Sequence, residues 1–208
     1  MKKKWIILFT FLFGMSLAAM GSDVIRAEEP SIRAKIGIKI KSGDRTRRAK
    51  TRDRLKAGDM LRIYVHPEKS SHVYVVYTDR KTATLLNMVQ QKVQSSTMVM
   101  PSIQEFYEVD GASKIESFTI ICSPVALQDV LSLVGSDEVA YNTWSELEKS
   151  LLEKSRIDLS QKSEKPFAIA GNVRGAGGSS GGDAFISNLQ IFSGKSILVK
   201  KYEFRVKK

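Results

Sequence analysis

Apolar and basic residues alternate near the start of the chain, over residues 32–41. Every second position is apolar, and these positions are Ile32, Ala34, Ile36, Ile38 and Ile40. Most positions between them are basic, namely Arg33, Lys35, Lys39 and Lys41. Successive side chains of a strand point to opposite faces, so the pattern predicts a half-buried strand with a basic outer face.

Two further alternating segments predict a β-hairpin. Apolar residues occupy every second position of 61–65 and again of 73–77. The five residues Pro67–Ser71 separate them, a common length for a hairpin connection. Shorter apolar or aromatic runs predict additional strands at residues 82–88, 106–109, 117–122, 167–170 and 197–206.

The apolar period changes to that of a helix after residue 122. Ser123 is predicted to cap a helix that begins at Pro124 and has an apolar face of Leu127, Val130, Leu131 and Val134. A second helix is predicted to run from Thr143 to about residue 154, because Thr143 and Glu146 form a capping-box pattern.

These elements predict a mainly β protein. We expect a β-sandwich-like, antiparallel fold with two helices inserted before the C-terminal strands, and α+β is the alternative class. Residues 28–208 are predicted to form a single β-rich domain, with helices at about 124–155 and C-terminal strands at about 166–207. The composition, 42% hydrophobic and 26% charged, is typical of a chain that buries a core.

The first 27 residues have the pattern of a signal peptide. Three lysines at positions 2–4 precede an apolar run that ends at the polar stretch 21–23. The run is slightly shorter than a membrane-spanning helix requires, so we expect cleavage, with an uncleaved anchor as the alternative. The protein is therefore predicted to be exported, periplasmic or extracellular, with no transmembrane span after cleavage.

Cys122 is the only cysteine of the chain. A single cysteine excludes an internal disulfide. Because Cys122 shares strand parity with Phe118 and Ile120, we interpret it as a buried thiol of the core.

Positive charge is concentrated in one part of the sequence. The formal charge of +11 falls to +8 for residues 28–208, once the four basic residues and the one acidic residue of the predicted signal peptide are removed. Residues 33–62 alone carry twelve basic residues against three acidic ones. Residues 42–54 show no periodicity, which predicts a solvated basic loop with six candidate anion-binding residues: Arg45, Arg47, Arg48, Lys50, Arg52 and Arg54.

Outside the cytoplasm, three kinds of anion are the expected partners of this basic loop. They are an envelope polyanion, an anionic lipid surface and an acidic protein partner. Nucleic acid ranks below them, because no aromatic residue for base stacking occurs between Pro30 and Tyr64. A solvated surface loop without a ligand remains the alternative.

A central part of the chain resembles the bacterial domain of unknown function 4384 family. The shared pattern is a Gly-Asp entry into a strand, an aromatic-rich partner strand and a Leu-Asn segment, here at Gly58-Asp59, residues 72–77 and residues 84–87. The resemblance covers about residues 55–124 and implies a small, β-rich exported module without an established activity. This chain lacks the proline expected before Asn87 and has the longer insertion 112–114 in a turn.

Motifs of common catalytic classes fail on closer comparison. Residues 177–181 fit the G-x-S-x-G pattern of serine hydrolases, but both histidines of the chain, His66 and His72, precede it. Residues 194–196 resemble the end of a P-loop, but Leu189 stands where the first glycine is needed. Two histidines and one cysteine do not complete a zinc site, and we predict no metal, no cofactor and no catalytic residue.

Three functional hypotheses follow, in this order. The first is a non-enzymatic interaction module of the cell envelope that uses the basic loop. The second is a glycan-acting or other hydrolase, recognisable by two carboxylates in one concave pocket, one of them with a raised pKa. The third is a structural or oligomerisation module that pairs through the edge of a terminal strand.

Overall fold

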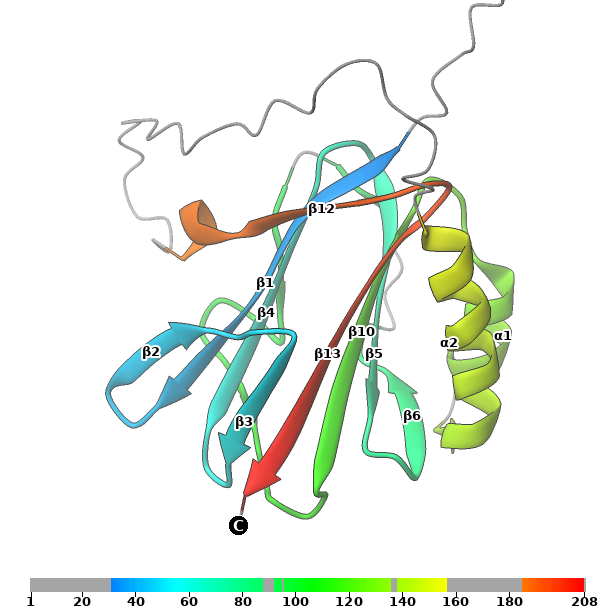
Figure 1. Cartoon of the computed structure of the whole chain (residues 1–208). Coiled ribbons are helices and arrows are strands. Elements are labelled where there is room, and N and C mark those ends of the chain that lie inside the picture. The colour runs from blue at the N-terminus through cyan, green and yellow to red at the C-terminus, as the bar shows by residue number, and fades with distance from the viewer. Residues whose placement is uncertain (1–30, 88–91, 95, 136–137, 157–184, 208) are drawn as a thin grey trace, which may run out of the picture.

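Two β-sheets face each other in the computed structural model of this chain (Figure 1). The structure describes residues 31–87, 92–94, 96–135, 138–156 and 185–207. The predicted signal peptide, residues 1–27, and the predicted strand 167–170 therefore lie outside the described residues.

The first sheet is ordered β12-β1-β4-β8, and all of its pairings are antiparallel. Strand β2 also pairs with β1, and β9 also pairs with β4. Its members are β1 (Ile32–Ser42), β2 (Arg45–Arg48), β4 (Met60–Pro67), β8 (Met98–Met100), β9 (Tyr107–Glu108) and β12 (Gln190–Gly194).

The second sheet is ordered β11-β6-β5-β10-β13-β3, with β7 paired to β5. Only β13 and β3 run parallel among its described pairings. Its members are β3 (Arg52–Lys56), β5 (Ser71–Thr78), β6 (Thr82–Leu85), β7 (Lys92–Val93), β10 (Ile115–Ser123), β11 (Val139–Ala140) and β13 (Leu198–Lys207).

The main core fills the space between the two sheets. Ile36 and Ile38 of β1 face Phe118 and Ile120 of β10 across it, and all four are almost fully buried. The alternation predicted for residues 32–41 is thus confirmed. Cys122 belongs to the same core, and burial raises the pKa of its thiol to about 12, which makes it a poor nucleophile.

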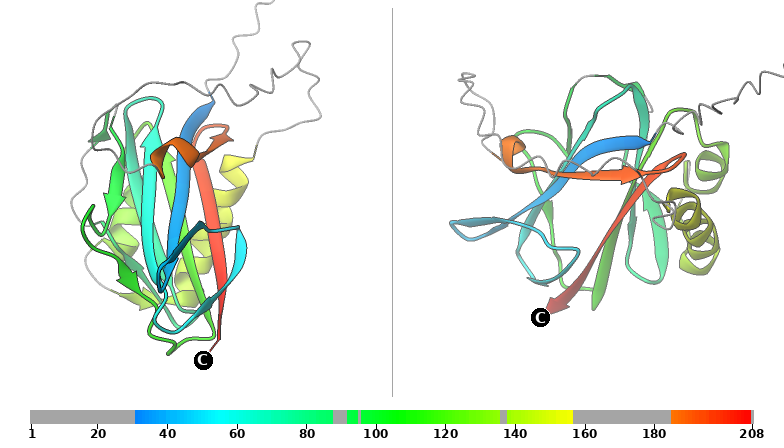
Figure 2. Two further views of the ribbon diagram at one scale, coloured as in Figure 1. Left: turned by 90° about the vertical axis from the view of Figure 1, so that its left-hand side faces the viewer. Right: turned by 45° about the horizontal axis from the view of Figure 1, so that its top comes forward.

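Two helices cover the outer face of the second sheet, so the molecule has three layers (Figures 1 and 2). They are α1 (Gln128–Val134) and α2 (Tyr141–Ser155). Trp144 and Leu151 of α2 pack into a second apolar cluster with Tyr74 and Val76 of β5. The prediction of a mainly β, sandwich-like fold with two helices before the last strands is confirmed. Neither helix has the length and apolar composition that a bilayer crossing requires.

The predicted hairpin of residues 61–65 and 73–77 is wrong. Strand β4 pairs with β1, β8 and β9, whereas β5 pairs with β10, β6 and β7, so the connection crosses between the sheets. The physical reason is that β5 is apolar on both faces: Val73 and Val75 face the inter-sheet core, and Tyr74 and Val76 lie beneath the helices. A strand that is covered on both faces occupies the interior of a layered fold.

The predicted helix caps are also wrong. Helix α1 begins four residues later than predicted, and Ser123 instead ends β10. Helix α2 begins at Tyr141 without a side-chain cap, so Thr143 lies inside its first turn. Both helices are positioned by the apolar residues that they bury, which outweighs the smaller contribution of a cap.

One buried polar network joins α2 to the second sheet. Glu148 of α2 is 4% exposed. It accepts hydrogen bonds from the Thr119 hydroxyl of β10 and, at 2.6 Å, from the Lys201 ammonium of β13. These contacts compensate a carboxylate that burial would otherwise destabilise.

Replacing Lys201 should therefore destabilise the fold. We expect Lys201→Met to lower the free energy of unfolding by about 2 kcal/mol, because Glu148 would remain buried without its cation but would keep the hydrogen bond from Thr119. Adding Glu148→Gln should recover more than half of the loss, since the amide oxygen still accepts from Thr119. Urea denaturation of the wild-type, single-variant and double-variant chains measures both effects. A double variant less stable than Lys201→Met would contradict this account.

Candidate functional site

The basic strand β1 divides one of its edges between two partners. Strand β12 pairs with it from Ile32↔Gly194 to Ile36↔Gln190, and β2 pairs with it from Lys39↔Arg48 onward. The other edge of β1 is paired along its length with β4. A gap therefore opens where β12 ends and β2 begins.

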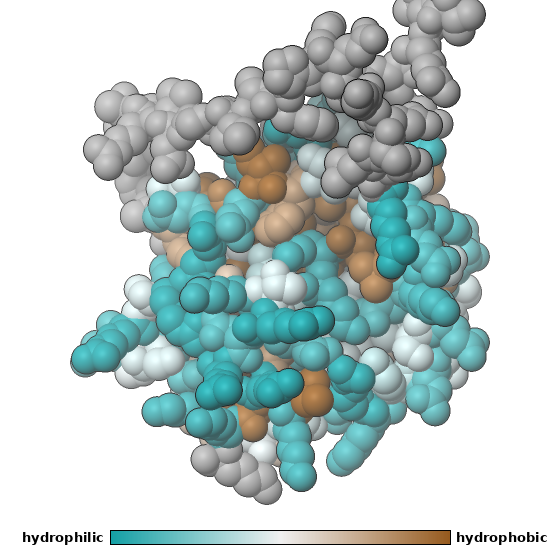
Figure 3. Space-filling model, viewed as in Figure 1, coloured by the Kyte–Doolittle hydropathy of each residue, from teal (hydrophilic) through white to brown (hydrophobic). Residues whose placement is uncertain are grey.

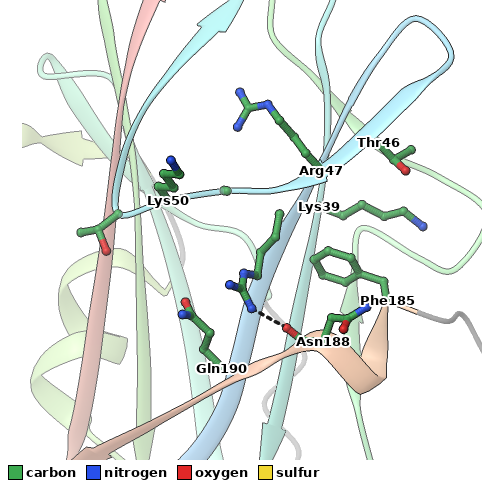
Figure 4. A pocket seen from close by; sticks show the side chains of 10 residues that line it. Lys39, Thr46, Arg47, Lys50, Phe185, Asn188 and Gln190 are labelled. Carbon is green, nitrogen blue, oxygen red and sulfur yellow. Dashed lines mark hydrogen bonds between the residues drawn. The ribbon is translucent and has the colours of Figure 1, made fainter. Parts of the chain in front are cut away.

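This gap is an open groove of about 860 Å³ (Figure 4). Four of its lining residues are basic, and no acidic residue lines it in the described part of the chain. The lining residues are Lys39, Thr46, Arg47, Arg48, Ala49, Lys50, Thr51, Phe185, Asn188 and Gln190. In the space-filling view, hydrophilic residues cover the neighbouring surface over β2 and β3 (Figure 3).

Residues 42–54, predicted to be a basic loop, instead contain the end of β1, a turn, β2 and the first three residues of β3. Only residues 49–51 connect the strands as a loop. Gly43, with φ of 58°, occupies the first position of the two-residue turn between β1 and β2. Glycine adopts this backbone conformation without the steric cost of a Cβ atom. The Gly43-Asp44 pair was the sequence signal for this hairpin.

The structure separates the six predicted anion-binding residues into two groups. Arg47, Arg48 and Lys50 line the groove. Arg45, Arg52 and Arg54 are exposed but do not line it: Arg45 follows the turn, and the other two lie on β3 of the second sheet. The predicted cluster is thus only partly brought together.

Arg47 is held by a neighbouring carboxylate. Its guanidinium forms an ion pair with Asp53 and donates at 3.1 Å to the carbonyl oxygen of Arg54. Burial alone would raise the pKa of Asp53, but hydrogen bonds from Arg47 and from the N–H groups of Arg54 and Lys50 lower it below its ordinary value. Asp53 therefore cancels part of the charge that Arg47 brings to the groove.

Arg48 ties the hairpin to a segment more than a hundred residues away. Its guanidinium donates at 2.7 Å to the carbonyl oxygen of Asn188, drawn as the dashed line in Figure 4. Asn188 ends the short 3₁₀ helix η1 (Ile186–Asn188), which precedes β12. Because the acceptor is a neutral carbonyl, the charge of Arg48 is not cancelled.

Phe185 forms an aromatic wall that the sequence analysis missed. Its ring lies 4.9 Å from the Tyr64 ring and 5.7 Å from the Lys39 Nζ atom. The segment approaches β1 closely, since a Cβ atom at Gly37 would lie 2.7 Å from Leu189 Cδ2. A glycine that interrupts the outer basic row of β1 was the one available signal for this approach.

A further cation contacts one of the residues that line the groove. Lys200 of β13 donates at 2.8 Å to the Thr51 hydroxyl, and its ammonium lies 4.5 Å from the Phe192 ring centroid. Burial lowers the pKa of Lys200. With its oxygen accepting from Lys200, the Thr51 hydroxyl has its own proton to donate toward the groove.

A second cavity of about 150 Å³ shares no lining residue with the groove. Its walls are apolar and aromatic, with three acidic residues: Glu108, Asp110 and Glu116. No three histidine, cysteine or acidic residues of the described chain are grouped so that they could hold a metal ion.

The pair of Arg47 and Asp53 gives the stability a dependence on pH. Because the pKa of Asp53 is lowered on folding, its contribution is present above the ordinary value of 3.8 and is lost as the pH falls below it. Asp53→Asn should cost less than about 1 kcal/mol at neutral pH, since the pair is partly exposed. Urea denaturation at several pH values should show this difference vanish in acid. A difference that grows in acid would contradict the assignment, and Asp44→Asn is a control of equal charge.

The chain matches no family model, no curated protein and no solved structure. The resemblance of residues 55–124 to the domain of unknown function 4384 family therefore stays a prediction.

Proposed function

We propose that this protein is a non-enzymatic, exported interaction module of the bacterial cell envelope that binds an anionic partner in the groove beside β1. One observation carries the proposal. Four basic residues and no described acidic residue line a concave surface of about 860 Å³. Like charges repel one another, and Asp53 offsets only part of the charge of Arg47, so this arrangement favours a ligand that neutralises the remaining charge.

The shape of the groove favours an envelope polyanion among the three expected partners. An extended anionic chain can enter a groove, whereas a flat bilayer contacts mainly protruding residues. Thr46, Thr51, Asn188 and Gln190 add hydroxyl and amide groups beside the cations. Such groups are the ordinary hydrogen-bond partners of phosphate and carboxylate oxygens. Phe185 also gives the groove an aromatic residue, which weakens the argument from local sequence that ranked nucleic acid lower.

The two rival functions receive less support. A glycan hydrolase would use paired carboxylates, one of them with a raised pKa. The 150 Å³ cavity does contain Glu108, Asp110 and Glu116, and burial raises the pKa of Glu116 to about 7. That volume is below the roughly 300–1,000 Å³ of ligand clefts and leaves little room for sugars on both sides of a scissile bond. Pairing through the terminal strand is disfavoured over residues 203–207, where β13 already has β3 on the edge opposite β10.

The test compares two triple variants that remove equal charge. The first changes Arg47, Arg48 and Lys50 of the groove to Gln, and the second changes Arg45, Arg52 and Arg54 outside it to Gln. Each cation beside an anionic surface contributes about 1 kcal/mol, so the groove variant should bind soluble polyphosphate roughly a hundredfold more weakly. The outer variant should stay within about tenfold of the wild type.

Binding is measured with residues 28–208, which contain every described element. Sedimentation with phosphatidylglycerol and phosphatidylcholine vesicles, across a salt series, tests the lipid alternative. Equal losses in the two triple variants would show that charge acts diffusely and would overturn the groove proposal. Circular dichroism of both variants verifies that the sandwich is intact.

A further inference from the structure

The small second cavity opens at one end of the inter-sheet core. Its lining combines residues of both sheets: Leu61, Tyr77, Leu86, Tyr107, Glu108, Asp110, Glu116 and Phe118. Glu108 and Asp110 are exposed, whereas Glu116, Leu61 and Phe118 are buried. Exposed carboxylates thus mark its mouth, and a buried carboxyl lies deeper.

Glu116 breaks the apolar pattern of its strand. It shares the inward face of β10 with Phe118 and Ile120, yet it is 4% exposed and bears a carboxyl group. It forms no hydrogen bond and no ion pair with any residue that the structure describes. Its carboxyl oxygens are not among the fully buried side-chain atoms that lack a partner, because they open into the cavity. A carboxyl group held in such a cavity is stabilised by a ligand or by a retained proton.

The surroundings of Glu116 favour its protonated form. Burial, and then the charges of Asp110 and Asp79, raise the pKa of Glu116 to about 7. Asp79 and Asp110 are themselves engaged in turns, where they accept from the N–H groups of Thr82 and Ala112. No basic residue lines the cavity in the described chain, so no cation of this protein compensates Glu116 there.

Aromatic rings supply the walls beside this carboxyl. Tyr77 of β5 and Phe118 of β10 are in contact, with ring centroids 5.4 Å apart. Tyr107 lines the cavity from β9, in the first sheet. Burial raises the pKa of both tyrosines, so they remain neutral phenols at physiological pH. Aromatic faces and carboxylates together attract organic cations.

The dimensions and chemistry restrict the ligand further. The described residues offer no set of three acidic or histidine ligands for a metal ion. A cavity of about 150 Å³ is smaller than the roughly 300–1,000 Å³ that drug-sized ligands occupy. A compact organic cation with a short apolar chain fits both the volume and the mixed lining.

We propose that this cavity binds a small primary alkylammonium ion, whose charged end pairs with Glu116 and whose alkyl chain contacts Tyr77 and Phe118. The site is independent of the groove, and its failure would leave the proposal for anion binding untouched. A cation site in a strongly basic protein also gives the chain two ligand surfaces of opposite sign.

Binding of the ammonium ion is coupled to loss of a proton. The cation stabilises the ionised carboxylate, so binding releases the proton that Glu116 holds below pH 7. For a pKa of about 7, the ionised fraction rises about thirtyfold between roughly pH 5.5 and 8.5, and affinity should rise by the same factor. Glu108, Asp110, Asp79, Tyr77 and Tyr107 are the other titratable groups that surround or influence this site.

Isothermal titration calorimetry with n-butylammonium chloride tests the proposal on residues 28–208. Neutral n-butanol, which has a similar size, is the ligand control. We expect butylammonium to bind more tightly at the higher pH and to release a proton, seen as a dependence of the heat on buffer ionisation. Absence of binding, or equal binding of butanol, would overturn the proposal.

Two variants separate Glu116 from general charge. Glu116→Gln should reduce butylammonium binding to the level of butanol, while Glu153→Gln, an exposed change of equal charge on α2, should leave it unchanged. Because the pKa of Glu116 is raised on folding, the wild type loses stability as the pH rises from 4.5 through 7. Glu116→Gln should remove this loss and melt at a higher temperature above pH 7, which also verifies its folding. Binding that survives Glu116→Gln would contradict the assignment.

Discussion

Backbone hydrogen bonding along β1 is the constraint on which the groove depends. A strand has two edges, and β1 satisfies one with β4 alone and the other with two partners in succession. The interval between those partners exposes the outer face near Lys39 and admits residues 185–190. The position of the cationic surface is therefore a result of strand pairing, and the hairpin, η1 and β12 form its rim.

Alternation along strands distributes the charges of this protein. Strand β1 keeps its apolar residues inside and its basic residues outside, which gives the first sheet a cationic outer row. Strand β10 follows the same rule for Phe118 and Ile120 but departs from it at Glu116. Where a charged residue takes an inward position, the packing leaves a cavity with ionisable walls. Glu148 is as deeply buried as Glu116, but hydrogen bonds from Thr119 and Lys201 stabilise its carboxylate.

Local patterns predicted the layers, and non-local pairings determined their assembly. The alternation of residues 32–41 depends only on which face meets the core, so it could be predicted from sequence. The pairing of β4 and β5 could not be judged from sequence in this way. Tyr74 and Val76 are buried only because α1 and α2 cover them, and the local pattern does not show that contact. Half of the predicted anion-binding residues reach the groove, since β3 carries Arg52 and Arg54 into the second sheet and Arg45 follows the turn. Phe185 and Asn188 line the groove although they lie more than 130 residues after Thr51, another of its lining residues, in the sequence. Local periodicity does not predict contacts between such distant residues.

The position of β13 has a consequence for the order in which the molecule folds. This strand is made last among the described elements, yet it lies inside its sheet, between β10 and β3. Strand β3 has no described strand partner other than β13, so the residues that follow the basic hairpin remain unpaired while the chain is being synthesised. Closure of the sandwich must wait for contacts between the first and last parts of the sequence, which lengthens the loop to be closed. The second sheet therefore gains its full set of described strands only after β13 has been synthesised.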